Sequence, residues 1–454
     1  MSNKNREQKL GTEPIIKLVF SLAMPAVIAQ VVNVLYNIVD RMYIGHIEGV
    51  GATALTGVGV CFPILTLISA FTNFVGMGGA PLAAIQMGKG RNDKAERILG
   101  NGVIILLAFS IVLSLFFRIY MEPLLYAFGA SDATIVYSME YLNIYLWGTI
   151  FVQMALGLNV FISCQGYART AMCSVLIGAF TNIVLDPIFI FGFGWGVKGA
   201  ALATIISQAC SATWVVTFLC SKRTTLRIRK EYLKPNWKII GTIAAMGISP
   251  FVMSSTESLV TITLNSGLQK YGGDLYVGTM TILQSVMQLI TVPMMGFAQG
   301  TQSIVSYNYG AHNKDRIKKT VLMTLCITST MVTLYCLLAW SIPGAFASMF
   351  TNDTELIALC EKVLPIFMGG IWMMGVQSTC QHSFMAMGQA KISLFLALLR
   401  KVILLVPLAI VFPKIVGVMG IYYAEPVADI GAALTTGTMF LLLFNKIIKK
   451  EMGE

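Results

Sequence analysis

Charged residues are scarce in this sequence. Of its 454 residues, 12% are Asp, Glu, Lys or Arg and 56% are hydrophobic, and the mean hydropathy is +0.74. A soluble domain carries about twice this share of charge, roughly a quarter of its residues. Apolar runs long enough to cross a ~30 Å hydrocarbon core, which takes ~20 helical residues, recur about twelve times. The composition therefore excludes a soluble globular protein and predicts an all-α, polytopic membrane protein.

Several functional motifs are also missing. The three histidines are scattered, there is no HExxH, and no Ser or Cys lies in a nucleophile motif, so we do not expect an enzyme or a cofactor. A GxxxxGK[ST] loop is absent, which excludes ATP hydrolysis by this chain. The nine cysteines contain no CxxC pair and lie mostly in apolar segments, so neither a disulfide framework nor a zinc site is expected.

The positive charge is unevenly distributed. The net charge is +11, and Lys and Arg concentrate in the segments 89–97, 222–238, 314–319 and 446–450. If the spans alternate from a cytoplasmic N-terminus, all four segments lie inside, as the positive-inside rule requires. The first apolar segment, about 15–44, is too long for a signal peptide and should remain as the first span. We expect a multi-pass protein of the plasma (inner) membrane with both termini cytoplasmic, in contact with membrane lipid, and no nucleic-acid partner.

The sequence also contains an internal repeat. Gly88 aligns with Gly310, and the segments 165–171, 196–208 and 23–27 align with 387–393, 417–429 and 248–252. All four matches have an offset of about 220–225 residues. We therefore predict two six-helix lobes, 1–221 and 239–454, joined by the basic linker 222–238. Duplicated bundles that rock around a central cavity are typical of secondary transporters.

Two carboxylates interrupt apolar runs in the first half. Asp186 follows Asn182 by one helical turn, and Asp40 follows Asn33 by two, so each pair shares a helix face. Thr204 begins the next span. These side chains offer only oxygen ligands, which suit a hard cation, and either carboxylate can hold a proton. Alternatively, Asp40 forms an ion pair with Arg41 or Arg118, and Asp186 caps a neighbouring helix or accepts a hydrogen bond from it.

The second half does not duplicate this set. It has Glu257 in its first span, Glu425 where the first half has Thr204, and the adjacent cations Arg400 and Lys401 inside an apolar run. A Glu257–Arg400 or Glu425–Arg400 ion pair would be structural; otherwise these residues bind substrate or couple protons. Gln284 and Gln288, one turn apart, are further candidates because a lipid-facing amide is costly.

The motifs together resemble those of the MATE (multidrug and toxic-compound extrusion) transporters over essentially the whole chain. The resemblance rests on "YNIVDRMYIGH", "GKGRNDKAER" and "NIVLDPIFIFGFGWGVKGAALATIISQ", and on the repeats of the last two in the second half. It implies twelve helices in two pseudo-symmetric lobes and cation-coupled export of amphipathic, often cationic, organic compounds. It also implies that Asp40, Asn182, Asp186 and Thr204 form a cation site, which would hold Na⁺ if transport is sodium-coupled, with Asn33 and Asn159 nearby.

Some alternatives stay open. A lipid-linked oligosaccharide flippase of the same superfamily would share the fold, and Arg400 and Lys401 are the only residues that suggest it. The sequence does not distinguish Na⁺ from H⁺ as the coupling ion. NorM-type members carry a helix-7 glutamate near Glu257 and a helix-10 aspartate, but here the tenth span offers Gln377, Gln381 and His382 instead. Small organic molecules are the expected partners, and no obligatory protein partner is evident.

Overall fold

The computed structural model describes residues 9–350 and 354–452 and contains only helices and their connections in that part of the chain. Eleven of its helices are long and apolar enough to cross a membrane, and a bent pair, 135–147 and 149–163, makes a twelfth span with a 59° break. The prediction of twelve spans is confirmed for the described residues.

The first half comprises α2 (Ile15–Gly45), α3 (Gly51–Val60), α4 (Phe62–Gly88), α5 (Asn92–Ile119), α6 (Met121–Ala127), α7 (Ile135–Trp147), α8 (Thr149–Ser163), α9 (Ala168–Pro187), the π-helical turn η1 (Ile188–Gly192) and α10 (Gly196–Cys220). The connector contains the 3₁₀ turn η2 (Lys230–Tyr232). The second half comprises α11 (Trp237–Gly272), α12 (Asp274–Gly310), α13 (Lys314–Ser341), α14 (Pro343–Ser348), α15 (Thr354–Phe367), the 3₁₀ turn η3 (Met368–Met373), α16 (Met374–Ala386), α17 (Ala390–Leu398), the π-helical turn η4 (Leu399–Leu405), α18 (Val406–Val416) and α19 (Met419–Met452).

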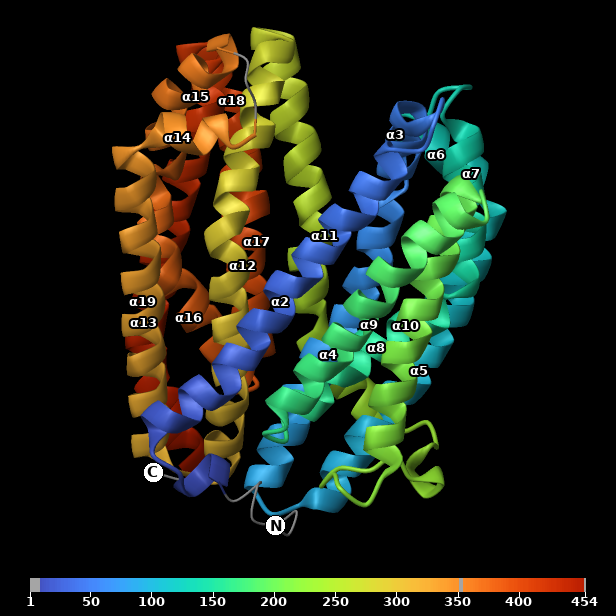
Figure 1. The fold of residues 1–454 in the computed structure, drawn as a ribbon. Coiled ribbons are helices and arrows are strands. Elements are labelled where there is room, and N and C mark those ends of the chain that lie inside the picture. The colour runs from blue at the N-terminus through green and yellow to red at the C-terminus, as the bar shows by residue number, and fades with distance from the viewer. Residues whose placement is uncertain (1–8, 351–353, 453–454) are drawn as a thin grey trace.

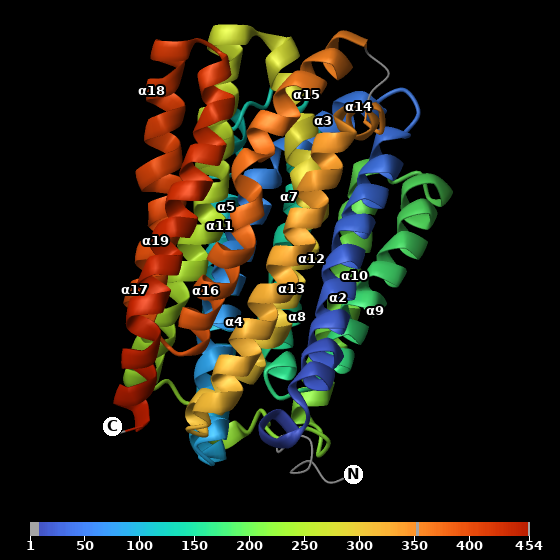
Figure 2. The same ribbon diagram turned by 90° about the vertical axis from the view of Figure 1, so that its left-hand side faces the viewer.

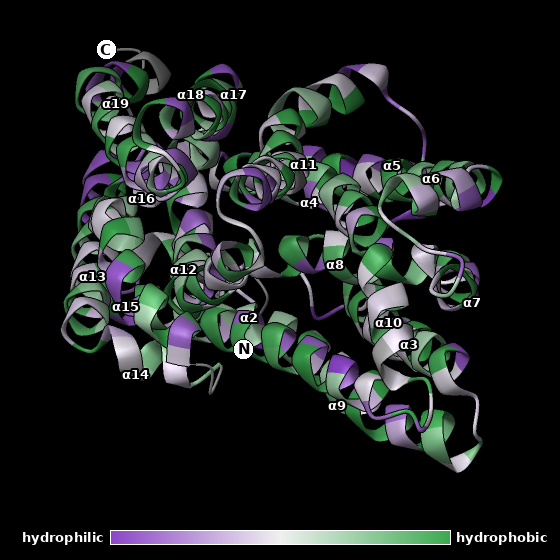
Figure 3. Ribbon diagram, turned by 90° about the horizontal axis from the view of Figure 1, so that it is seen from above, coloured by the Kyte–Doolittle hydropathy of each residue, from purple (hydrophilic) through white to green (hydrophobic). Residues whose placement is uncertain are grey.

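The two halves form a V (Figure 1). They converge at the end that carries both termini, which we call the closed end, and diverge at the opposite, open end. They meet mainly along two helix pairs, α2 with α12 and α4 with α11 (Figure 3), and α4 also contacts α12. In Figure 2, α2 lies beside α12 and α13 of the other half. The structure therefore has the pseudo-symmetric, two-lobed arrangement that the repeat predicts.

Small residues allow the lobes to approach closely. A Cβ atom on Gly78 would come within 2.8 Å of Cα of Gly247, and one on Gly300 within 2.5 Å of Cα of Ala23. Small residues at such crossings let helix backbones pack tightly where no hydrophobic effect drives association. Gly78 and Gly300 are 222 residues apart and Ala23 and Gly247 are 224 apart, which is close to the repeat offset in both cases. The two contacts are thus repeat-related copies of one interface.

The connector 222–238 is fixed to the first lobe. Oε1 of the buried Gln165 accepts hydrogen bonds from Oγ1 of Thr224 (2.7 Å) and from the backbone N–H groups of Thr225 (3.0 Å) and Leu226 (2.8 Å). The Glu96 carboxylate accepts from the backbone N–H of Arg227 (3.2 Å) and pairs with Nε of Arg229 (3.0 Å). The linker that the sequence predicts is therefore an ordered surface of this lobe, although the exact lobe boundaries stay a prediction.

Candidate functional site

Asp40 and Asp186 come together in the half of the first lobe near the open end. Asp40 lies in the last turns of α2, and Asp186 lies at the end of α9 and is fully buried. Their carboxyl groups are hydrogen-bonding neighbours. Two ionised carboxylates in such direct interaction repel each other unless a proton or a cation lies between them. The pair is therefore a place for one positive charge.

The neighbours of this pair are polar and uncharged. Nδ2 of Asn182 donates to Oδ1 of Asp186 at 3.1 Å, one turn away on the same helix. On α10, Oγ1 of Thr204 donates to the Ala200 carbonyl oxygen at 3.0 Å and is also a hydrogen-bonding neighbour of the Tyr141 hydroxyl. Tyr141, on α7, interacts electrostatically with Asp40 as well. Four helices thus contribute oxygen atoms to one region.

Three oxygen atoms of the site have no hydrogen-bond partner among the described residues. They are Oδ1 of Asp40, Oδ2 of Asp186 and Oδ1 of Asn182, and all three are buried. A buried acceptor without a partner costs about 1–3 kcal/mol, and more if it is charged. Oxygen atoms alone are the ligands that hard cations prefer. These three oxygen ligands therefore fit Na⁺ or a proton.

The basic residues near the open end do not neutralise Asp40. The Arg41 guanidinium lies over the Phe62 ring, 4.6 Å from its centroid, and that of Arg118 lies over the Trp147 ring at 3.7 Å. Neither forms a salt bridge with Asp40, although Arg41 adds some favourable electrostatic interaction. The alternative that Asp40 simply pairs with Arg41 or Arg118 is therefore not what the structure contains.

The two asparagines proposed as further ligands lie differently. Asn33 is two turns from Asp40 on α2 and is half-buried. Asn159, on α8, donates from Nδ2 to the Ala171 carbonyl oxygen (3.2 Å) and accepts from the Ser174 hydroxyl (3.1 Å). Those partners lie roughly 18–23 Å along α9 from Asp186, at ~1.5 Å per residue. The structure does not bring Asn159 to the carboxylate pair.

The backbone changes its geometry directly after Asp186. Pro187 cannot donate a backbone hydrogen bond, and a kink is expected there. Instead of a break, α9 continues through Pro187 into the π-helical turn η1. In the second lobe, Arg400 and Lys401 lie in the π-helical turn η4. Single π-helical turns are frequent at functional sites, because the wider turn moves side chains off the regular helix positions.

Arg400 is the centre of an ion-pair cluster in the second lobe. Its Nη2 atom donates to Oε1 of Glu425 (3.1 Å), and its Nε atom donates to Oδ1 of Asp429 (2.6 Å). All three side chains are largely buried. The Glu425–Arg400 pair that the sequence suggested is thus present, and the Glu257–Arg400 pair is not. Oδ2 of Asp429 has no partner among the described residues.

Glu257 pairs with Lys401 instead of with Arg400. Nζ of Lys401 contacts the Glu257 carboxylate and also donates to the Met253 carbonyl oxygen at 3.0 Å. The Glu257 side chain is 60% exposed, although the residue lies near the middle of the long helix α11. Gln284 is half-buried and Gln288 exposed on α12. Of these candidates, Glu257 is the accessible carboxylate.

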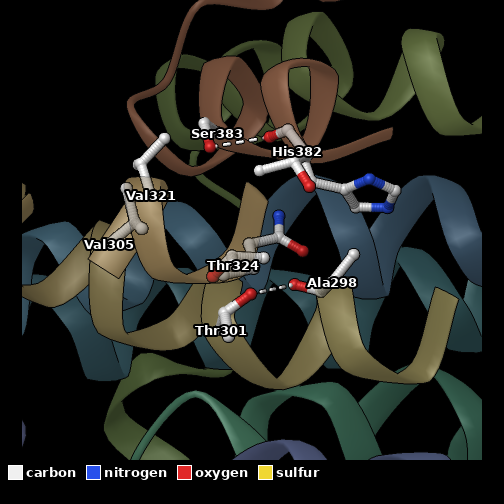
Figure 4. Close-up of a pocket in the computed structure, with 9 residues that line it drawn as sticks. Ala298, Thr301, Val305, Val321, Thr324, His382 and Ser383 are labelled. Carbon is white, nitrogen blue, oxygen red and sulfur yellow. Dashed lines mark hydrogen bonds between the residues drawn. The ribbon is translucent and has the colours of Figure 1, made fainter. Parts of the chain in front are cut away.

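A small polar pocket lies between α12, α13 and α16 (Figure 4). The hydroxyls of Thr301 and Ser383 donate to backbone carbonyl oxygens, at 3.0 Å to Ala298 and 2.7 Å to Thr379. His382 lines the pocket, and its Nδ1 lies 2.8 Å from the Ser378 carbonyl oxygen. Every lining residue is uncharged or a histidine, so the pocket provides no carboxylate for a cation on α16.

Sequence reasoning missed two of these residues. Asp429 follows Glu425 by one helical turn, so its position on the same face could have been read from the spacing. Tyr141 lies in a tyrosine-rich run on α7 and carries no comparable signal. Its approach to Thr204 and Asp40 depends on how α7 packs against α10.

Comparisons with known proteins match both lobes of this chain. The family model described as MatE matches residues 25–188 and 250–411, one match in each lobe. Multidrug export protein MepA of Staphylococcus aureus (strain MSSA476) is 23% identical over 435 residues, which cover 96% of this chain and 95% of the relative. The protein of the same name from Staphylococcus haemolyticus (strain JCSC1435) is 23% identical over 434 residues, covering 95% of each.

Solved structures share the fold. One, described as the outward-facing conformation of a multidrug resistance MATE family transporter of the MOP superfamily, has a TM-score of 0.90 at 23% identity and covers 97% of this chain and 98% of that one. Another, a MATE in the bent conformation, has a TM-score of 0.91 at 24% identity, covering 98% and 99%. The match extends over nearly the whole of each chain.

Proposed function

The chain belongs to the MatE family of multi-pass membrane transporters, and from this membership we propose that it is a cation-coupled antiporter that exports amphipathic, cationic organic compounds. The observation that supports coupling is the Asp40–Asp186 pair, which together with Asn182 has three buried oxygen atoms without a partner among the described residues. In this proposal one Na⁺ or one proton occupies the pair, and alternating access of the two lobes carries substrate outward. The coupling ion is cargo, and no resident cofactor is required.

The position of α2 suggests how occupancy of the site is transmitted. Asp40 lies near one end of α2, and the other half of the same helix packs against Gly296 and Gly300 of α12 in the opposite lobe. Binding a cation between Asp40 and Asp186 favours a short distance between α2 and α9. Because α2 forms one of the contacts between the lobes, the ion biases whether that contact is closed. Release of the ion from the site removes this bias.

The open end of the V is the expected side for substrate release. The exposed carboxylate of Glu257 is our candidate for holding the positive group of a substrate, with Gln284 and Gln288 as weaker candidates. All four basic segments and both termini lie at the closed end (Figure 1). By the positive-inside rule this end is cytoplasmic, so we place the protein in the plasma membrane with the V open to the outside.

The flippase alternative receives no support from the second lobe. Holding a pyrophosphate would require cationic groups that are free of internal counter-ions. Arg400 is bound to two carboxylates and Lys401 to one. Releasing Arg400 would leave the buried carboxylates of Glu425 and Asp429 without their cation, at a cost of several kcal/mol.

Dye efflux from proteoliposomes under separate Na⁺ and pH gradients tests the proposal. We expect one of the two gradients to drive efflux, and Asp186→Asn to abolish the response. Efflux that ignores both gradients, or that persists unchanged in Asp186→Asn, would show that the carboxylate pair does not couple transport. Lipid scrambling without dye transport would favour the flippase.

A further inference from the structure

A hollow of about 230 Å³ lies between α2 and α9 in the half of the membrane near the closed end. Its wall on α2 is almost entirely apolar, and on α9 it is formed by one apolar residue and one arginine. The residues that matter here are Phe20, Met24, Pro25, Ile28, Met172 and Arg169. Neither the cation site nor the ion-pair cluster of the second lobe reaches this hollow.

The hollow opens toward the acyl chains. Ile16, Phe20, Met24, Ile28, Val31, Leu35, Ile38 and Met42 recur along α2 at intervals of three or four residues, and all are exposed. This spacing places them on one helix face. Other faces of α2 are occupied, because Leu22 and Ala23 are buried against Gly300 of α12 and Asp40 meets Asp186. An exposed apolar face on a membrane-spanning helix is covered by lipid.

Arg169 is the unusual member of the wall. It is the second residue of α9, is exposed, and forms no hydrogen bond or ion pair with the residues that the structure describes. At this position in a spanning helix, a long basic side chain extends to the level of the lipid headgroups. A planar guanidinium binds two phosphate oxygens at once. The positive charge of Arg169 thus has no partner among the described residues, and it lies at the level of the membrane where the lipid phosphates are found.

We propose that this hollow is a binding site for one anionic phospholipid, with an acyl chain against Met24, Pro25 and Met172 and the phosphate on Arg169. The volume is smaller than the ~300–1,000 Å³ of sites for drug-sized ligands, and suits a length of acyl chain. A cationic export substrate is disfavoured by Arg169, so this is a site distinct from the transport path. The proposal requires only that the protein spans a membrane, and it is independent of ion coupling.

The acyl chain of the lipid would pack against a turn of α2 that lacks one backbone hydrogen bond. Pro25 has no N–H group, so the carbonyl oxygen of Ser21 lacks its usual helical donor. A ligand that fills this side of the helix and binds only the folded protein raises its melting temperature. Anionic lipid is therefore expected to stabilise the protein more than zwitterionic lipid does.

The test uses the full chain purified in detergent, with added phosphatidylglycerol or phosphatidylcholine of identical acyl chains. Native mass spectrometry reports the number of retained lipids, and a thermal unfolding scan reports stabilisation. Arg169→Gln removes the headgroup contact, and Met24→Trp fills the hollow. The matched controls are Arg223→Gln, an exposed basic residue of the connector, and Leu35→Trp, on the same exposed face of α2 but outside the hollow.

We expect one phosphatidylglycerol to be retained and to raise the melting temperature. Arg169→Gln should weaken this binding about fivefold, the effect of one basic residue near an anionic surface, and Met24→Trp should abolish it, while both controls retain it. Equal retention of phosphatidylcholine, or equal effects of Arg169→Gln and Arg223→Gln, would overturn the headgroup assignment. Retention by Met24→Trp, or by Met24→Phe if the tryptophan variant does not fold, would overturn the location.

Discussion

Gly88 and Gly310 pack reciprocally at the closed end of the molecule. A Cβ atom on Gly88 would collide with the backbone at Tyr307, and one on Gly310 would collide with the backbone at Ile85. Each glycine thus meets the residue three positions before the other, and the two glycines are also equivalent in the internal repeat. The contact therefore follows the pseudo-two-fold symmetry that relates the two lobes, and it joins the ends of α4 and α12.

Gly88→Ala is therefore expected to open the closed end. Overpacking of this kind costs about 1–3 kcal/mol, enough to shift the equilibrium between open and closed forms about fivefold to a hundredfold. Spin labels at positions 94 and 318 should report a longer distance in the variant. Gly241→Ala, where an added Cβ would meet no atom within 4 Å, is the matched control. An unchanged distance distribution in Gly88→Ala would mean that this contact does not hold the lobes together.

Asp40→Asn and Asp186→Asn should each reduce ion-driven dye efflux at least about tenfold, and the double variant should be little worse than either. Residues that hold one ion act as a unit, so their effects do not add. The measurement is the initial efflux rate from proteoliposomes under an imposed gradient. Glu140→Gln is the control, since Glu140 pairs with Lys198 at 3.1 Å and lies outside the site. Additive losses would argue against a shared ion.

Arg400→Leu should strongly destabilise the protein. The substitution leaves Glu425 and Asp429 buried without their cation, and breaking a buried ion pair in this way costs about 3–5 kcal/mol. The triple change Arg400→Leu, Glu425→Gln and Asp429→Asn should recover most of the loss, because no unbalanced charge remains. Thermal unfolding in detergent measures both. If the triple variant is stable but no longer couples efflux to an ion gradient, the cluster has a role beyond structure.

Glu257→Gln should affect transport more than stability. The side chain is 60% exposed, and an exposed ion pair contributes at most about 1 kcal/mol. If Glu257 holds the positive group of a substrate, the variant should lose efflux of cationic dyes and keep that of neutral ones. Lys401→Gln, which removes the competing internal cation, should strengthen binding of cationic dyes. A parallel loss for neutral and cationic dyes would contradict a role in charge recognition.

Glu96→Gln should loosen the connector. The neutral side chain loses its ion pair with Arg229 and weakens the bond from the Arg227 backbone. Because 222–238 is rich in Lys and Arg, limited trypsin digestion of the purified protein should then cut it several times faster, in proportion to local opening. Glu231→Gln, an exposed substitution in the same segment, should leave the rate unchanged. Equal cleavage rates would show that Glu96 does not restrain the connector.

Much of the first-lobe site could be predicted from the sequence. Helical spacing places Asn182 and Asp186 on one face, and the cost of a carboxylate in a span directs attention to Asp40 and Asp186. Asn159 entered only through family resemblance, and the structure places it on α8, hydrogen-bonded to α9 far from Asp186. In the second lobe the charged residues were identified, but the partner of Glu257 was not Arg400.

The sequence by itself determined the membrane class, the number of spans, the duplication and the helix face that each polar residue occupies, because composition and periodicity are properties of single helices. Only the tertiary structure decided that Asp40 meets Asp186 rather than Arg41, that Arg400 binds two carboxylates, and that Arg169 borders a hollow. These relationships depend on the rotation and axial position of one helix against another, which are fixed by the packing of all twelve spans together.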